Sequence, residues 1–154
     1  MTPDDLFGLA GMAAMAGWTV LVLAPRRWAA LNAFPALVIP AGLSALYAAL
    51  VLRHFAGAGG GFGSLAEVAE LMSDPWVLLA GWVHYLAFDL VVGASSARRM
   101  DAAGVSRLVQ APLLLTIFLF GPAGFLLVLI VAGAMRLPAL LRLPSFPENR
   151  HVLA

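Results

Sequence analysis

The chain contains no cysteine and no lysine, and charged residues make up only 11% of its 154 positions. The absence of cysteine excludes disulfides, iron–sulfur clusters, thiol nucleophiles and thiolate zinc sites. Soluble domains usually carry about 25% charged residues, so the scarcity of charge also argues against a water-soluble fold. The net charge of +1 gives no electrostatic basis for a nucleic-acid partner.

Most of the chain is apolar: 62% of its residues are hydrophobic, and its mean hydropathy is +0.95. A chain of this length has too little interior to hide so much apolar surface from water. The sequence therefore predicts an all-α, polytopic helical bundle with membrane lipid as its solvent. We expect a single membrane domain over residues 1–136, followed by a proline-containing tail over 137–154.

Four charge-poor stretches predict four transmembrane helices, near residues 6–24, 31–52, 75–97 and 110–135, because a span needs about 20 apolar residues. Pro35 and Pro40 predict an irregular or kinked start of the second helix. The fourth stretch would be about 42 Å long as one straight helix, against an apolar core of about 30 Å. We expect Gly121-Pro122 to kink it, with a re-entrant pair of half-helices as the less favoured alternative.

A short helix is predicted at 65–73, where Ser64 and Glu67 form a capping-box pattern. Two locations are compatible with this helix: the membrane interface, or an ordinary helical turn outside the membrane. Arginines indicate the orientation of the bundle, since cytoplasmic loops are enriched in them. The loops with Arg26 and with Arg98 are expected on the cytoplasmic side and both chain ends outside, although three arginines of the tail oppose this. The acidic start of the chain lacks the positive region of a secretory signal, so we expect the first helix to be retained.

Two ionisable residues, His84 and Asp89, fall in the middle of the third predicted helix. An aspartate at that depth costs about 3 kcal/mol on insertion scales, so it has to face protein or water. Five residues separate the two, which is about 140° around a helix and about 7.5 Å along it, so they are not expected to bond directly. Tyr85 shares the face of Asp89, whereas Phe88 shares that of His84.

Such residues mark either a functional site or a structural tie between helices. Partners available for a structural tie are Asn32, Thr116 and Gln110. One histidine and one aspartate at this spacing match no metal-ligand pattern, and no cofactor motif is present, so we expect neither a metal nor a cofactor.

Three stretches together resemble a known family of membrane proteins. The first is His84-Tyr85-Leu86-Ala87-Phe88-Asp89-Leu90, followed by Val92-Gly93. The others are Ser64-Leu65 with Pro75-Trp76, and Pro112-Leu113-Leu114-Leu115-Thr116 running into Gly121-Pro122-Ala123-Gly124. Over about residues 5–136 the chain resembles the abscisic-acid-deficient-four-like, or neoxanthin synthase-like, integral membrane proteins of bacterial type.

The resemblance implies an intramembrane isomerase that acts on an epoxy-carotenoid or a related isoprenoid and needs no redox cofactor. Asp89 would then be the acid, Tyr85 would orient it, and His84 would be the base, because a carboxyl group kept from water favours its protonated form. The expected substrate contacts are Trp82, Phe88, Thr116 and Phe118. The alternative is a non-catalytic protein that binds a carotenoid or lipid or assembles a membrane complex. The location implied is the bacterial inner membrane.

Overall fold

The computed structural model describes residues 1–134, and every regular element within them is helical. The predicted tail over 137–154 lies outside the described residues. The elements are α1 (Pro3–Leu23), α2 (Ala29–Ala33), a π-helical turn (Phe34–Val38), α3 (Ile39–His54), a 3-10 turn (Phe55–Gly57), α4 (Leu65–Leu71), α5 (Pro75–Ala102), α6 (Arg107–Phe120) and α7 (Pro122–Ala134).

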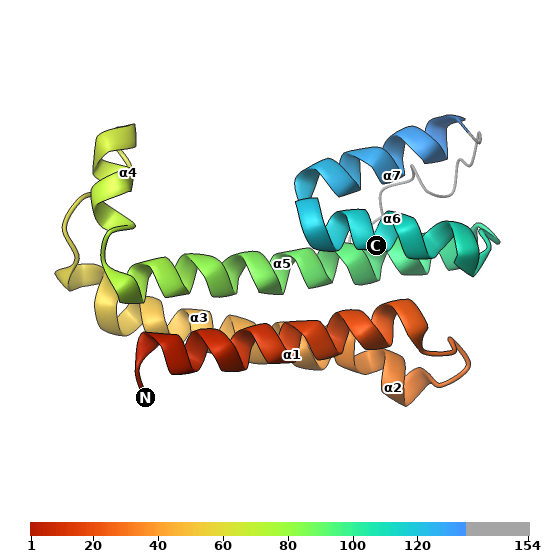
Figure 1. The fold of residues 1–154 in the computed structure, drawn as a ribbon, viewed down its shortest axis with the longest axis horizontal. Coiled ribbons are helices and arrows are strands. Elements are labelled where there is room, and N and C mark those ends of the chain that lie inside the picture. Colours follow the sequence, from red (N-terminus) through yellow and green to blue (C-terminus); the bar gives the residue numbers. More distant parts are fainter. Residues whose placement is uncertain (135–154) are drawn as a thin grey trace, which may run out of the picture.

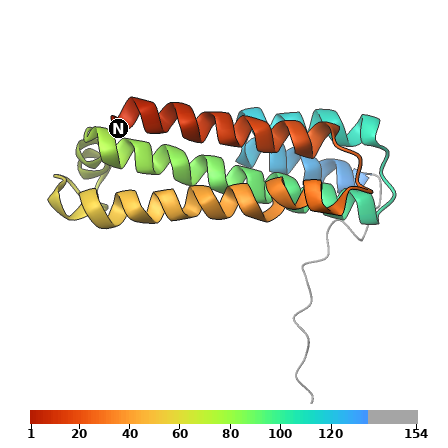
Figure 2. The same cartoon turned by 90° about the horizontal axis from the view of Figure 1, so that it is seen from below.

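Helix α5 is the centre of the arrangement. It packs against α1 and α3 on one side and against α6 on the other (Figure 1). Turned by a right angle, the three long helices α1, α3 and α5 run side by side (Figure 2). Helix α4 projects from the start of α5, at the same end of the bundle as the N-terminus, whereas α6 and α7 cover the opposite half of α5. The two ends of α5 therefore have different neighbours.

Three of the four predicted membrane helices are confirmed as helices long and apolar enough to cross a bilayer. They are α1, the continuous run Ala29–Gly57, and α5. The irregular start expected for the second is also present, as the π-helical turn that contains Pro35 and precedes Pro40. In this turn the N–H of Ile39 donates to the carbonyl of Phe34, five residues back. The wider turn keeps the run helical where prolines remove backbone donors.

The predicted short helix is present as α4, two residues shorter than expected. The Ser64 hydroxyl accepts a hydrogen bond from the N–H of Glu67 at 3.2 Å, as the capping pattern indicated. The Glu67 carboxylate turns back to accept the N–H of Gly63 at 3.0 Å. These two bonds tie the glycine-rich segment before α4 to its first turn.

The structure corrects the fourth predicted helix over 110–135. Instead of one kinked helix it is a hairpin of α6 and α7, two helices of 14 and 13 residues. Each is about 20 Å long, which is shorter than the roughly 30 Å apolar core of a bilayer. The chain reverses at Gly121, whose φ of 46° and ψ of −108° are open mainly to glycine. Pro122 then begins α7, where its missing N–H costs nothing.

The two arms of the hairpin touch at Gly124. A Cβ on this residue would collide with the backbone of Thr116 and Ile117 in α6. Helices in lipid associate through close packing of small residues, because apolar burial alone does not favour one neighbour over another. Gly124 therefore allows α7 to lie directly on α6.

We expect Gly124→Ala to destabilise the hairpin by about 1–3 kcal/mol, because a backbone contact cannot yield as a flexible side chain does. The matched control is Gly133→Ala on the same helix, where an added Cβ meets nothing within 4 Å. There the substitution should be neutral or stabilising by up to about 1 kcal/mol. Thermal unfolding of the two variants in detergent measures the difference, and equal midpoints would contradict this packing.

Candidate functional site

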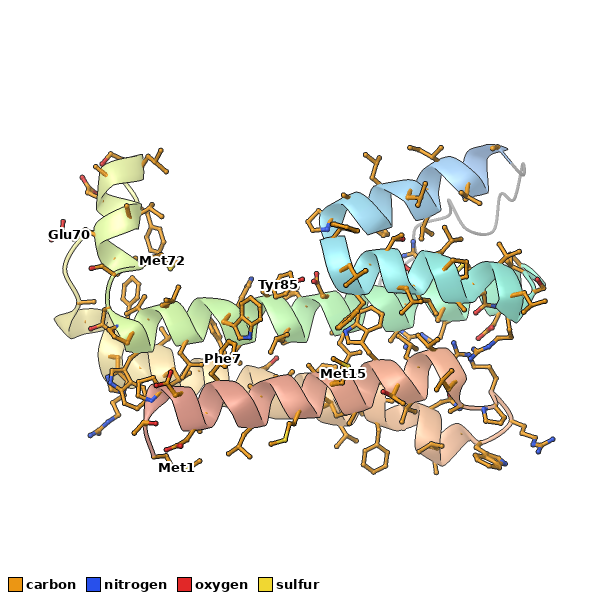
Figure 3. The ribbon with its side chains drawn as sticks, viewed as in Figure 1. Met1, Phe7, Met15, Glu70, Met72 and Tyr85 are labelled. Carbon is orange, nitrogen blue, oxygen red and sulfur yellow. The ribbon has the colours of Figure 1, made fainter. Side chains whose placement is uncertain are left out.

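One face of α5 carries a row of residues at the spacing of successive helical turns: Leu78, Trp82, Tyr85 and Asp89, here called the open face. The Leu78 and Trp82 side chains are 55% and 41% exposed. The Tyr85 side chain lies on the side of α5 between α4 and the α6–α7 hairpin (Figure 3). Intervals of three and four residues keep this row within a narrow stripe, so a long apolar molecule could touch all of it.

Aromatic rings line the first half of this face. The ring of Trp82 lies 5.4 Å from that of Tyr85 and also 5.4 Å from that of Phe7 on α1, measured between centroids. A cavity of about 250 Å³ opens beside them, lined by Pro3, Asp4, Phe7, Pro75, Leu78, Leu79 and Trp82. The start of the open face is therefore an apolar hollow with aromatic walls.

Asp89 ends the row at the hairpin. Its carboxylate lies so close to Gly121 that a Cβ there would be 3.0 Å from Oδ1 and 3.1 Å from Oδ2. Oδ2 is buried and has no hydrogen-bond partner among residues 1–134. Tyr85 lies one helical turn before it on the same face of α5. The start of α7 is also adjacent, and a helix N-terminus carries partial positive charge.

The polar groups considered as partners of Asp89 are engaged elsewhere. Asn32 and Gln110 belong to a separate cluster at the end of the bundle. The Thr116 hydroxyl donates to the carbonyl of Leu113 in its own helix at 2.7 Å. Leaving a buried polar group unsatisfied costs about 1–3 kcal/mol, so a purely structural tie would be a poor reason to retain this carboxyl.

His84 has different neighbours from Asp89, as the helical spacing predicted. Its ring stacks on Phe88 with a centroid distance of 4.6 Å and lies 5.3 Å from the ring of Tyr47 on α3. The structure thus brings Trp82, Tyr85 and Asp89 together on one face and places His84 with Phe88 on another.

Phe118 lies in neither group. Its ring packs against Trp18 at 5.4 Å, next to a core cluster between α1, α5 and the hairpin. Sequence reasoning missed Phe7 and Gly121 as parts of the site. Phe7 meets Trp82 only through the packing of α1 on α5. The Gly121-Pro122 pair was visible as a break, but its contact with Asp89 depends on the chain turning back.

Comparison with known proteins gives one match. A family model described as ABA DEFICIENT 4-like matches residues 5–127. No curated protein matches the chain, and no solved structure matches it. The match spans α1 to α6 and the first turns of α7, and so includes the whole open face.

Gly121→Ala should destabilise the protein more than Gly104→Ala. Both residues have positive φ, 46° and 71°, so both substitutions strain the backbone. A Cβ at Gly104 meets nothing within 4 Å, whereas one at Gly121 meets the Asp89 carboxylate. Thermal unfolding in detergent is measured for each glycine variant alone and in combination with Asp89→Ala. The comparison isolates the contact between residue 121 and the Asp89 carboxylate. Asp89→Ala should relieve part of the cost at Gly121 and none at Gly104, and equal relief at both would contradict the contact.

Proposed function

Because the chain belongs to the ABA DEFICIENT 4-like family, we propose that it is an intramembrane isomerase of an epoxy-carotenoid or a related isoprenoid. The substrate lies along the open face of α5, with its epoxide at Asp89. The observation that supports this proposal most directly is the buried, unpartnered Oδ2 of Asp89 at the end of a row that begins with the exposed side chains of Leu78 and Trp82. The bacterial type, and with it the inner membrane as location, rests on the resemblance of the sequence.

The dimensions and chemistry of the open face suit a rod-shaped polyene. From Pro75 to Asp89 the helix rises about 21 Å, a length comparable to most of the apolar thickness of a bilayer. Aromatic rings favour stacked and edge contacts with other π systems. Leu78 and Trp82 offer apolar area, whereas Asp89 with Tyr85 offers the one polar end. A molecule with a long conjugated chain and an oxygenated ring matches that order.

A single carboxyl group can both donate and take up the proton that the isomerisation requires. Opening an epoxide to an allenic alcohol breaks one C–O bond, adds a proton to the oxygen and removes a proton from a neighbouring carbon. In the proposed reaction one oxygen of protonated Asp89 gives its proton to the epoxide, and the other takes the proton from carbon. The electron pair of that C–H bond becomes the new double bond. Nothing is oxidised or reduced, and Asp89 returns to its starting state.

This assignment gives Tyr85 the role of orienting the carboxyl and leaves His84 outside the reaction. The role expected for His84 as base would need the histidine on the open face, and its aromatic contacts lie with Phe88 and Tyr47. Thr116 and Phe118 likewise contribute to the hairpin and the core rather than to the open face. The proposed substrate contacts are therefore Phe7, Leu78 and Trp82.

The second candidate function is non-catalytic binding of a carotenoid or lipid, or assembly of a membrane complex. It is favoured by the fact that the open face carries a single carboxyl group and no histidine, so no separate base accompanies the acid. Both functions use the same face, so binding and conversion have to be measured separately.

Binding is tested by Leu78→Gln with violaxanthin, an epoxy-carotenoid, as the probe. Polyene binding should quench tryptophan fluorescence, and a polar side chain on the open face should weaken the affinity about tenfold. Leu126→Gln on α7 is the matched control, because Leu126 is 57% exposed against 55% for Leu78. Equal losses in the two variants would place the ligand elsewhere.

Catalysis is tested by Asp89→Asn, which keeps the size of the side chain and removes the transferable proton. The variant should bind violaxanthin like the wild type and lose conversion about 100-fold or more, measured by chromatography of the pigments. His84→Gln should keep conversion within about twofold. Full conversion by Asp89→Asn refutes the catalytic assignment. Binding without conversion by the wild type supports the non-catalytic candidate, and a 100-fold loss in His84→Gln restores histidine as the base.

A further inference from the structure

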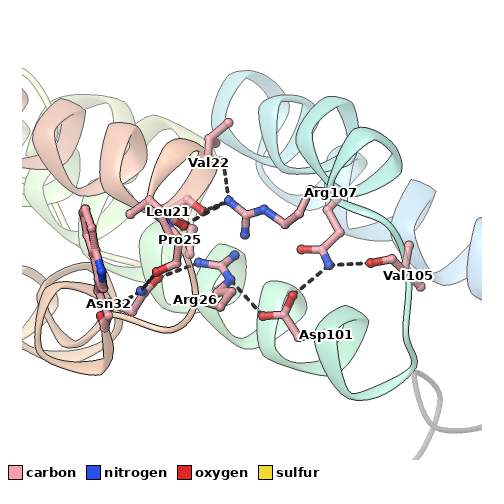
Figure 4. A network of polar contacts seen from close by, with 11 residues as sticks. Leu21, Val22, Pro25, Arg26, Asn32, Asp101, Val105 and Arg107 are labelled. Carbon is pink, nitrogen blue, oxygen red and sulfur yellow. Dashed lines mark hydrogen bonds and ion pairs between the residues drawn. The ribbon is translucent and has the colours of Figure 1, made fainter.

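A second polar site lies where the end of α1, the end of α5 and the start of α6 meet (Figure 4). Arg26 and Asp101 form an ion pair there, with 2.8 Å between Nε and Oδ2. The amide of buried Gln110 donates to the other carboxylate oxygen, Oδ1, also at 2.8 Å. Arg26 donates a further bond to the side chain of Asn32 at 2.8 Å. Each oxygen of the single carboxylate in this site therefore already has a charged or polar donor.

Arg107 is the second cation of the site, and the carboxylate does not reach it. Its Nη2 donates to backbone carbonyls at the end of α1, of which Leu21 and Ala24 are each 3.4 Å away and Val22 is closer. These carbonyls carry the partial negative charge of a helix C-terminus. The cluster thus contains two guanidinium groups and one carboxylate, which leaves a net positive charge.

Hydrogen-bond donors remain unused on both arginines. Nη2 of Arg26 and Nη1 of Arg107 are buried and have no partner among residues 1–134. Burial lowers the pKa of Arg26, the nearby Arg107 lowers it further, and Asp101 opposes both effects. Two like charges and unpaired N–H groups in one place are unfavourable unless an anion joins them.

A surface cavity of about 760 Å³ adjoins these groups. Arg26, Arg107 and Ser106 line it, and Leu23 and Leu108 form part of its wall. Ser106 precedes α6 without capping it through its side chain, so the positive end of that helix dipole also faces this region. The two leucines are 73% and 89% exposed. Cationic groups inside and bare apolar side chains beside them form an amphipathic site.

We propose that this cavity binds the phosphate group of an anionic lipid, with Arg26 and Arg107 contacting the phosphate and Leu23 and Leu108 contacting the lipid's apolar part. A guanidinium fork matches the oxygens of a phosphate in pairs. The exposed leucines favour a lipid over free phosphate, which would leave them without a role. The site is about 18 Å along α5 from Asp89, so it stands apart from the proposed isomerase function.

The binding experiment uses purified full-length protein in detergent with three probes: phosphatidylglycerol, phosphatidylcholine and inorganic phosphate. Phosphatidylglycerol should raise the thermal midpoint in a saturable way, and the other two should have little effect at the same concentration. Arg107→Gln should weaken phosphatidylglycerol binding about tenfold or more, because it removes a charge-assisted contact. Arg27→Gln is the control: it removes the same charge from an exposed neighbour that does not line the cavity.

Ser106→Asp keeps the proposal testable if Arg107→Gln fails to fold. Aspartate is a good N-cap and favours the helix dipole, so the variant should be at least as stable as the wild type without lipid. Its negative charge at the cavity should nevertheless weaken phosphatidylglycerol binding. Unchanged binding in this variant, or an equal loss in Arg27→Gln, overturns the site. Equal stabilisation by inorganic phosphate assigns the site to free phosphate and overturns the lipid.

Discussion

Backbone groups in contact with lipid have to find their hydrogen bonds within the chain, and this constraint governs the whole bundle. It explains why the long helices continue through Pro35 and Pro40, where a π-helical turn restores the bonding. It also explains why the reversal at Gly121, between α6 and α7, lies against α5. Only there can a break in the helix be covered by protein. The reversal meets Asp89, the only carboxylate of residues 1–134 that lies in the middle of a long helix. The irregular backbone and the main candidate for chemistry therefore coincide.

The two proposed sites divide α5 between them. Its first half carries exposed Leu78 and Trp82 and half-buried Tyr85, in a row that ends at Asp89. Its last turn carries Asp101, which is saturated by Arg26 and Gln110. The same residue type therefore has opposite surroundings within one helix. A fully bonded aspartate fixes neighbouring helices to one another, whereas an underbonded one has capacity left for a ligand.

Much of the helical framework could be predicted, because it depends on local properties of the chain. The charge-poor runs gave α1, the run through α3, and α5, and the five-residue interval separated His84 from Asp89. Family membership followed from the string around these residues. The hairpin could not be decided locally, since Gly121-Pro122 permits a kink as well as a reversal. What selects the reversal is the fit of Gly124 on the backbone of α6, which involves residues from both arms.

The site was predicted only in part for the same reason. Asn32 and Gln110 were named as possible partners for a buried polar residue of the third helix. They instead bond Arg26 and Asp101, which come together only at the junction of three helices. The hydrogen bonds from Arg107 to the carbonyls at the end of α1 likewise depend on the packing of α6 beside α1.

The hairpin also changes the expected number of membrane crossings from four to three. Four full crossings would return both chain ends to one compartment, which placed the arginines at 136, 142 and 150 opposite those at 26, 98 and 107. A bundle that crosses with α1, the α2–α3 run and α5 alone crosses an odd number of times. The start of α1 and the end of α7 accordingly lie at opposite ends of the bundle, and α7 ends on the side where α1 ends and α6 begins (Figure 1). The described part of the chain thus ends on the arginine-rich side of the bundle, and an excess of positive charge is usual on the cytoplasmic side of membrane proteins.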